Sequence, residues 1–192
     1  MYKHLEPNIN IIQVPFAPFI DGVDRKVKLS NHLTIGELYD STKVLNKNDL
    51  NLHGIPVHPN FLQLFELLRS HTKEPLYLGS SYRSHNWEVS QNRTGTSQHV
   101  QAIAYDFNGK NLSNVLDEAL ETKNALYKEL RKIGVNAFGE YSWGYHLDFR
   151  TNKPNNEIYY WSEKKKTNNL ILFSIIALIL FYIKKSYKKW KI

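Results

Sequence analysis

Residues 97–106 read Ser-Gln-His-Val-Gln-Ala-Ile-Ala-Tyr-Asp, and the rest of the chain is organised around them. They place a histidine and an aspartate seven residues apart, with small residues between them. The segment 102–107 has the apolar composition of a buried strand, on which Ala104 and Asp106 would share one face because side chains alternate. A buried carboxylate is costly unless it is paired or binds a metal. Asp106 is therefore expected to have a cationic partner.

A second histidine and a second aspartate stand in Trp-Gly-Tyr-His-Leu-Asp at residues 143–148. His146 and Asp148 are two residues apart and would share one strand face, while Tyr145 and Leu147 take the other. A half-buried surface strand would show the same alternation. Together with the first stretch, however, two imidazoles and one carboxylate form the ligand set of a catalytic zinc that keeps its fourth position for water. The two stretches together supply four candidate ligands: His99, Asp106, His146 and Asp148.

Helices and strands are predicted from apolar periodicity and from signals at helix ends. Thr34 and Glu37 have the form of a capping box that begins a short helix. A second helix follows Pro59, and a third spans about 113–133 and would end at Gly134. Strands are predicted at 76–83, 102–107, 135–138, 145–149 and 158–161, with a turn over 139–144. This order predicts an α+β domain with a largely antiparallel central sheet and flanking helices.

Length and composition limit the kinds of site that the chain can build. At 192 residues it has room for one ordinary domain with a sizeable core. It has no cysteine, which excludes disulfides, thiolate zinc sites and thiol nucleophiles. A tight metal site must therefore be built from His, Asp or Glu.

The net charge of +7 is carried by the end of the chain. Residues 164–192 contain eight lysines and no acidic residue, so 17 of the 25 basic residues and all 18 acidic residues belong to 1–163. The formal charge of that larger part is −1. A nucleic-acid partner is therefore not expected.

Residues 170–183 form an uncharged, apolar run of fourteen residues with lysines on both sides. As a helix the run spans ~21 Å, short of the ~30 Å hydrocarbon core, but three polar residues before it and snorkelling lysines would close the gap. A membrane-anchor or transmembrane helix is expected within 164–192, and a buried terminal helix is the alternative. Five lysines after the run against three before it favour an outside domain. Residues 1–29 show no signal-peptide pattern and are expected to be an irregular lead-in.

The spacing Ser97-x-His99-x4-Ala104-x-Asp106, followed by His146-x-Asp148, resembles the zinc D-alanyl-D-alanine carboxypeptidases and endopeptidases of bacterial cell walls. Phage endolysins and the vancomycin-resistance dipeptidases belong to that superfamily, and the Hedgehog signalling domain shares its fold. Residues 80–84, Ser-Ser-Tyr-Arg-Ser, resemble its strand-end motif. The resemblance covers about residues 33–150. It implies a zinc peptidase domain of this fold over 30–163, acting on peptidoglycan peptides of a bacterial wall, in a bacterial or phage protein.

The resemblance also implies that His99, Asp106 and His146 hold the zinc, and it implies roles for the residues around it. Arg83 would bind the carboxylate or the polarised carbonyl of the substrate, Ser97 would support the ligands, and Tyr82 would lie near the substrate. The general base is expected to be Glu140, six residues before His146, as in the Hedgehog-like branch. Asp148 is the second choice, although it could equally orient a ligand.

Three positions depart from the family pattern. Trp143 stands where the dipeptidase branch has a glutamate, and Ala102 and Ser81 replace glycines that the family uses in tight geometry. These departures leave a second hypothesis open, a binding module that keeps the metal and has lost turnover. A membrane-tethered structural protein without a metal is the third.

Overall fold

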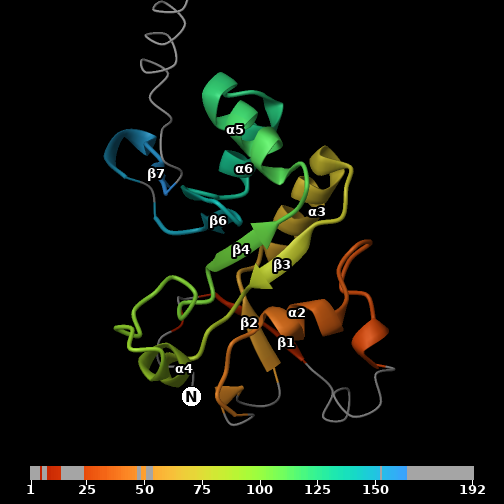
Figure 1. The fold of residues 1–192 in the computed structure, drawn as a ribbon, viewed down its shortest axis with the longest axis vertical. Coiled ribbons are helices and arrows are strands. Elements are labelled where there is room, and N and C mark those ends of the chain that lie inside the picture. The colour runs from red at the N-terminus through yellow and green to blue at the C-terminus, as the bar shows by residue number, and fades with distance from the viewer. Residues whose placement is uncertain are drawn as a thin grey trace, which may run out of the picture.

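The computed structural model describes residues 5, 8–13, 24–46, 49–50, 54–151 and 153–163. A five-stranded sheet lies at its centre (Figure 1). The strands run in the order β3 (Tyr77–Ser80), β4 (Ala104–Asn108), β6 (Gly144–Asp148), β5 (Ala137–Tyr141) and β7 (Tyr159–Ser162). The first three pairings are antiparallel and β5 pairs with β7 in parallel. The α+β class is confirmed, and the sheet is mixed, with antiparallel pairs in the majority.

Helices and a small second sheet surround this central sheet (Figure 1). The helices are α2 (Ile35–Ser41), α3 (Phe61–Thr72), α4 (His85–Ser90), α5 (Leu112–Thr122) and α6 (Ala125–Lys132). Strands β1 (Asn10–Gln13) and β2 (Gly54–Val57) form an antiparallel pair, and short 3-10 turns occupy Asp24–Lys26 and Pro154–Asn156. The sequence predicted an irregular lead-in over 1–29. Strand β1 lies within it, so this segment is not irregular throughout.

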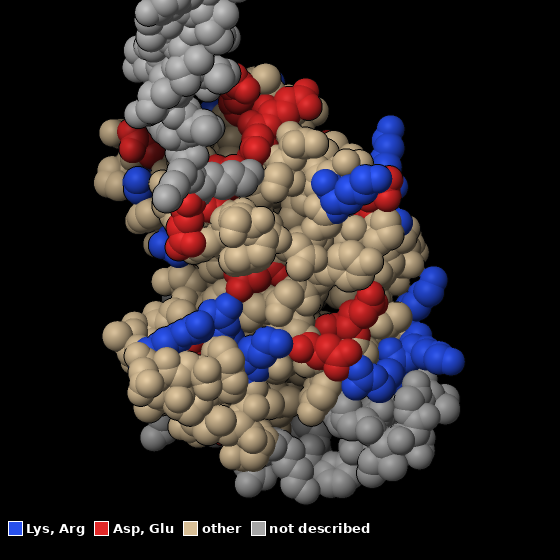
Figure 2. Space-filling model, viewed as in Figure 1, with Lys and Arg blue, Asp and Glu red and all other residues tan. Residues whose placement is uncertain are grey.

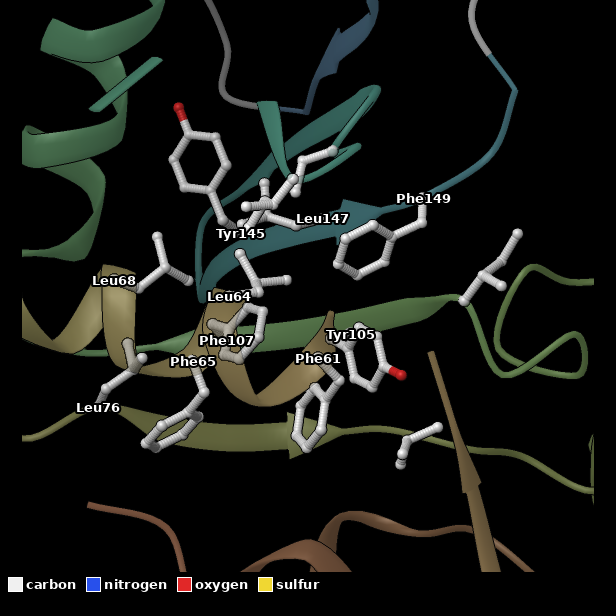
Figure 3. Packing of buried hydrophobic residues seen from close by; sticks show 14 of the residues in the cluster. Phe61, Leu64, Phe65, Leu68, Leu76, Tyr105, Phe107, Tyr145, Leu147 and Phe149 are labelled. Carbon is white, nitrogen blue, oxygen red and sulfur yellow. The ribbon is translucent and has the colours of Figure 1, made fainter. Parts of the chain in front are cut away.

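The core lies between α3 and one face of the central sheet (Figure 3). The residues at helical spacing in α3, Phe61, Leu64, Phe65 and Leu68, are buried. The ring of Phe61 stacks on Tyr105 of β4 with centroids 4.3 Å apart. Phe107 of β4 and Leu147 of β6 belong to the same cluster. Since side chains alternate along a strand, burying these residues on the helix side turns their neighbours to the other face. The sheet therefore has an apolar helix face and an opposite face that is available for chemistry.

Helix ends follow from local hydrogen bonds. The capping box of α2 is confirmed, because Glu37 N donates to Thr34 Oγ1 (3.3 Å) and Thr34 N donates to Glu37 Oε2 (2.8 Å). The single helix predicted over 113–133 is instead two, α5 and α6. Lys123 takes the left-handed conformation (φ 53°), and Asn124 caps the next helix by accepting a hydrogen bond from Tyr127 N (3.2 Å).

Helix α4 and strand β2 are elements that the sequence patterns did not predict. Both are short, which leaves too few residues for a periodic pattern. The signal for α4 is Ser84, whose Oγ accepts a hydrogen bond from Trp87 N (3.1 Å) as a helix N-cap.

Among the residues that the structure describes, no helix has the length and apolarity needed to cross a bilayer. The anchor expected within 164–192 lies outside the described residues. On the face drawn in Figure 2, acidic and basic side chains are interspersed among larger areas of other residues. This agrees with the near-neutral charge counted for residues 1–163.

Candidate metal centre

The face of the sheet opposite the core carries the predicted ligands. In the antiparallel register Asp106 of β4 pairs with His146 of β6, and Ala104 pairs with Asp148. His99 comes from the turn that leads into β4, where Val100 N donates to the carbonyl of residue 97 (3.0 Å). The strand register and this turn bring together residues that are 40 and 47 positions apart in the chain.

The three residues meet at one carboxylate oxygen. Asp106 Oδ1 lies 3.2 Å from His99 Nε2 and 2.8 Å from His146 Nδ1. All three side chains are buried, and their possible ligand atoms lie within 4.8 Å of one another. The sequence prediction is confirmed to this extent: these residues form a buried group that can hold a metal ion.

A second hydrogen bond fixes which nitrogen of each imidazole faces Asp106. His99 Nδ1 lies 2.7 Å from the carbonyl oxygen of Ser81, which can only accept, so Nδ1 carries the proton. His146 Nε2 lies 3.1 Å from the Asp148 carboxylate and is the donor there. Partners of this kind orient metal-binding histidines. The nitrogens left for a metal are His99 Nε2 and His146 Nδ1.

Burial decides the charge of His99. Its imidazole is almost fully buried, and this desolvation lowers the pKa of His99 although Asp106 opposes the shift. A neutral His99 that donates through Nδ1 presents an unprotonated Nε2 to Asp106 Oδ1 at 3.2 Å. Two acceptors at that distance repel one another unless a cation lies between them. Either a metal ion or a second proton on Nε2 removes this repulsion, so the contact is compatible with a metal ion at this position.

The carboxylates beside the histidines are held ionised. Burial alone would raise the pKa of Asp106, but the two imidazoles beside it, His146 first, outweigh this effect and the pKa is lowered. Arg83 Nη2 donates to the other oxygen of Asp106 at 2.6 Å. The pKa of Asp148 is lowered in the same way, against the effect of burial, by hydrogen bonds to His146 and Arg150. His146 lies between the two carboxylates, which raise its pKa against the effect of burial.

The donor set fits zinc. Imidazole nitrogen and carboxylate oxygen are ligands that zinc takes at about 2.0–2.2 Å, so two ligand atoms of one ion lie at most roughly 4.4 Å apart. The observed spread of 4.8 Å exceeds that limit, so the ligand atoms must draw together by a few tenths of an ångström to share one ion. Two nitrogens and one oxygen also leave a coordination position for water or substrate.

A cleft of about 440 Å³ opens over the three residues. Its lining includes two arginines and three aromatic residues: Arg83, Arg93, Tyr141, Trp143 and Trp161. Asp106 is its one carboxylate among the described residues. The wall formed by Trp161 needs a glycine at position 139. A Cβ there would lie 2.4 Å from the indole ring, which packs 5.5 Å from the ring of His146.

Glu140, the expected general base, does not lie in this cleft. The β5–β6 register pairs Gly139 with His146 and Glu140 with Tyr145, so the Glu140 side chain takes the helix face of the sheet. There it lines a different pocket and accepts a hydrogen bond from Tyr160 (2.9 Å). The structure therefore does not bring Glu140 together with the three ligands, because strand alternation turns its side chain to the other face.

Other predicted site residues have mixed outcomes. Tyr82 was expected near the substrate. It is 6% exposed and belongs to the core cluster, and it is not part of the cleft lining. Ser97 lines the cleft, and its buried Oγ has no hydrogen-bond partner among the residues that the structure describes. Asp148 is fully buried behind His146, which is the geometry of a group that orients a ligand and not of a base facing solvent.

Two residues at the site were missed by sequence reasoning. Glu88 of α4 is 2% exposed and lies 3.3 Å from both Arg83 Nη1 and Arg93 Nη1. Arg150 binds Asp148 through Nε (2.8 and 2.9 Å) and Nη2 (2.5 Å). Arg150 had a signal, because it continues the two-residue spacing of His146 and Asp148 along one face. Glu88 had none, since α4 was not predicted.

Comparison with known proteins adds no assignment to this geometry. No protein-family model matches the chain, and neither the curated proteins nor the solved structures yield a match. The family resemblance of the motifs therefore remains an expectation, and function has to be argued from the site.

Proposed function

We propose that the protein is a zinc-dependent peptidase that hydrolyses D-alanine-type peptide bonds in peptidoglycan stem peptides or cross-links. The observation that carries the proposal is the convergence of His99 Nε2, His146 Nδ1 and Asp106 Oδ1 at the floor of an open cleft. Each imidazole is oriented by a second partner, and the unprotonated His99 nitrogen faces a carboxylate oxygen that it cannot approach favourably without a metal ion or a second proton between them.

In this proposal the chain binds zinc through His99, Asp106 and His146. Zinc in such a site lowers the pKa of bound water towards ~7 and polarises a substrate carbonyl. The Ser81 carbonyl and Asp148 keep the two imidazoles in the tautomers that metal binding requires. Arg83 is a positioning residue, because its guanidinium holds the second oxygen of Asp106.

The charges of the cleft support a substrate that carries a carboxylate. Arg83, Arg93 and Arg150 all line it. Each also pairs with a carboxylate of this chain, so a substrate carboxylate would share guanidinium groups, which are suited to planar, bidentate recognition. A volume of about 440 Å³ accommodates a short peptide segment. The end of a peptide chain satisfies both conditions. We place the domain on the wall side of a membrane in which residues 164–192 form the anchor.

The position of Glu140 favours a second candidate, a metal-retaining module that binds cell-wall peptide without cleaving it. Hydrolysis needs a group that takes a proton from the attacking water and passes it to the leaving amine. Among the described residues, Asp106 is the one carboxylate in the cleft, and it is committed to the metal position. A binding module does not need such a group.

The proposal is tested with the full-length chain purified in detergent. We expect about one zinc per chain by elemental analysis and release of peptide fragments from purified peptidoglycan, detected by mass spectrometry and abolished by a chelator. His99→Ala should lose both zinc and activity, whereas His71→Ala, at an exposed position of α3, should keep both.

The outcomes separate the candidates. A chain that binds zinc and cell-wall peptide but cleaves no peptide would establish the binding module. A wild-type chain that binds no zinc would exclude both candidates and leave a structural protein.

A further inference from the structure

A second hollow adjoins the metal cleft. Its volume is about 410 Å³, and two of its lining residues, Gln98 and Arg150, also line the metal cleft. The two spaces are therefore neighbours that share these two side chains as parts of their walls. A peptide that lies in the metal cleft and continues past Arg150 would enter this hollow, which we call the outer pocket.

Arg150 lines both spaces and is held rigidly. Its guanidinium binds Asp148 through Nε and Nη2, and it lies over the rings of Tyr159 and Trp161, 5.0 and 5.5 Å from their centroids. Stacking on two aromatic rings and pairing with a buried carboxylate fix the orientation of the planar group before a ligand arrives. Little side-chain entropy is then lost when it binds an anion.

The outer pocket offers hydrogen-bond donors over an apolar floor. The floor includes Ile103 and Phe149. His58 stacks on the Phe149 ring at 3.8 Å, with the two planes 8° apart. His58 Nδ1 accepts a hydrogen bond from Asn60 N (3.2 Å), so the proton of the neutral ring is on Nε2. Burial lowers the pKa of His58 to about 4, so the ring is neutral at physiological pH.

Charge and donors point to one ligand chemistry. The residues that line the outer pocket include Arg150, His58, Gln98 and Thr151 and include no acidic residue among those described. A carboxylate accepts hydrogen bonds only, and it is strengthened by a guanidinium partner. A neutral amide or a cation would gain less from this set of groups.

We propose that the outer pocket is a second substrate subsite, and that it binds a carboxylate-bearing residue of the peptide next to the segment held at the metal cleft. This inference rests on the proposed function for the identity of the ligand as a peptide. It makes Arg150 and His58 determinants of specificity for an extended acidic peptide over a dipeptide. Arg150 and His58 do not take part in bond cleavage.

The test measures binding without turnover. Two acetylated peptides that end in Lys-D-Ala-D-Ala differ by glutamate or glutamine before the lysine, and their affinities for the chelator-treated full-length chain are compared by calorimetry. We expect the glutamate peptide to bind about tenfold more tightly, equivalent to about 1.4 kcal/mol. His58→Phe, which keeps the stacked ring and removes the donor, and Thr151→Val, at an exposed position, should each reduce the preference at least threefold.

His71→Phe, away from both spaces, is the matched control and should keep the full preference. Equal affinity of the wild-type chain for the two peptides, or an unchanged preference in both pocket variants, would overturn the subsite. Zinc content and hydrolysis are measured on untreated samples of each preparation, before the chelator is added. A glutamate preference in a chain that lacks zinc and activity would sustain the subsite and reject the peptidase.

Discussion

The two faces of β4 and β6 differ in polarity although they belong to the same strands. On one face Tyr105, Phe107 and Leu147 are fully buried and pack on α3. On the other face, one residue away along the same strands, Asp106 and His146 form a hydrogen-bonded group at the floor of a cleft. The comparison teaches that the apolar face anchors the strands and so fixes the register that brings the polar side chains together.

The largest expected effect is obtained by breaking the helix face. Phe107→Ala should lower the free energy of unfolding by about 3–5 kcal/mol, because it removes a fully buried ring and leaves a cavity. Denaturant titration of the full-length chain measures the change. Tyr77→Ala, at a position of β3 that is 62% exposed, should change it by less than about 0.5 kcal/mol. A similar loss in both variants would show that the helix face is not the main source of stability.

Breaking the other face should remove the metal and leave the fold. Asp106→Asn keeps the shape of the side chain but loses its charge beside Arg83 and the two histidines. We expect zinc affinity to fall more than about 100-fold, with a stability loss of about 1–3 kcal/mol. Competition with a zinc indicator measures the affinity, and far-ultraviolet circular dichroism checks the fold.

Asp117→Asn is the control on the helix face of the sheet. Asp117 belongs to α5 and accepts a hydrogen bond from the Tyr145 hydroxyl. It should leave the zinc affinity unchanged. If it reduced the affinity as much as Asp106→Asn does, the separation of the two faces would be contradicted.

His58 stacks on Phe149 of the core and also lines the outer pocket, and the pH dependence of stability tests how far it is buried. Burial lowers the pKa of His58 to about 4 from 6.5, so between these values the unfolded chain binds a proton that the folded chain does not. Stability must therefore fall as the pH is lowered from 6.5 to 4, by an amount on the order of 1–2 kcal/mol from this residue. Denaturation of wild type and His58→Phe across that range measures it, and an identical slope in both would refute the assignment.

The smallest effect is expected in the turn that joins the two ligands of the first stretch. Ala102 has a φ of 59°, in the left-handed region where a Cβ is unfavourable, and it lies between His99 and Asp106. Ala102→Gly relieves this strain but makes the unfolded chain more flexible, so we expect a gain below about 1 kcal/mol. Thermal unfolding measures it, with unchanged zinc affinity as the sign that the turn keeps its geometry.

Much of the candidate site followed from local sequence pattern. The two-residue spacing of His146 and Asp148 placed both on one strand face, and the apolar neighbours of Asp106 indicated its burial, as the structure has them. The stripe from Phe61 to Leu68 and the capping box at Thr34 depended on residues within one or two turns of a helix. Periodicity carries such information because each side chain's direction is fixed by its own backbone.

The sequence by itself therefore determined which residues can bind a metal and which side of each strand is apolar. Tertiary structure decided which residues meet. The β5–β6 turn contains two residues, Ser142 and Trp143, and pairs Gly139 with His146. If the turn also took in Gly144, Glu140 would lie opposite His146. A register shift of one position moves every side chain of a strand to the other face. The same holds for Arg150 and His58, which meet at the outer pocket only through the packing of segments 92 residues apart.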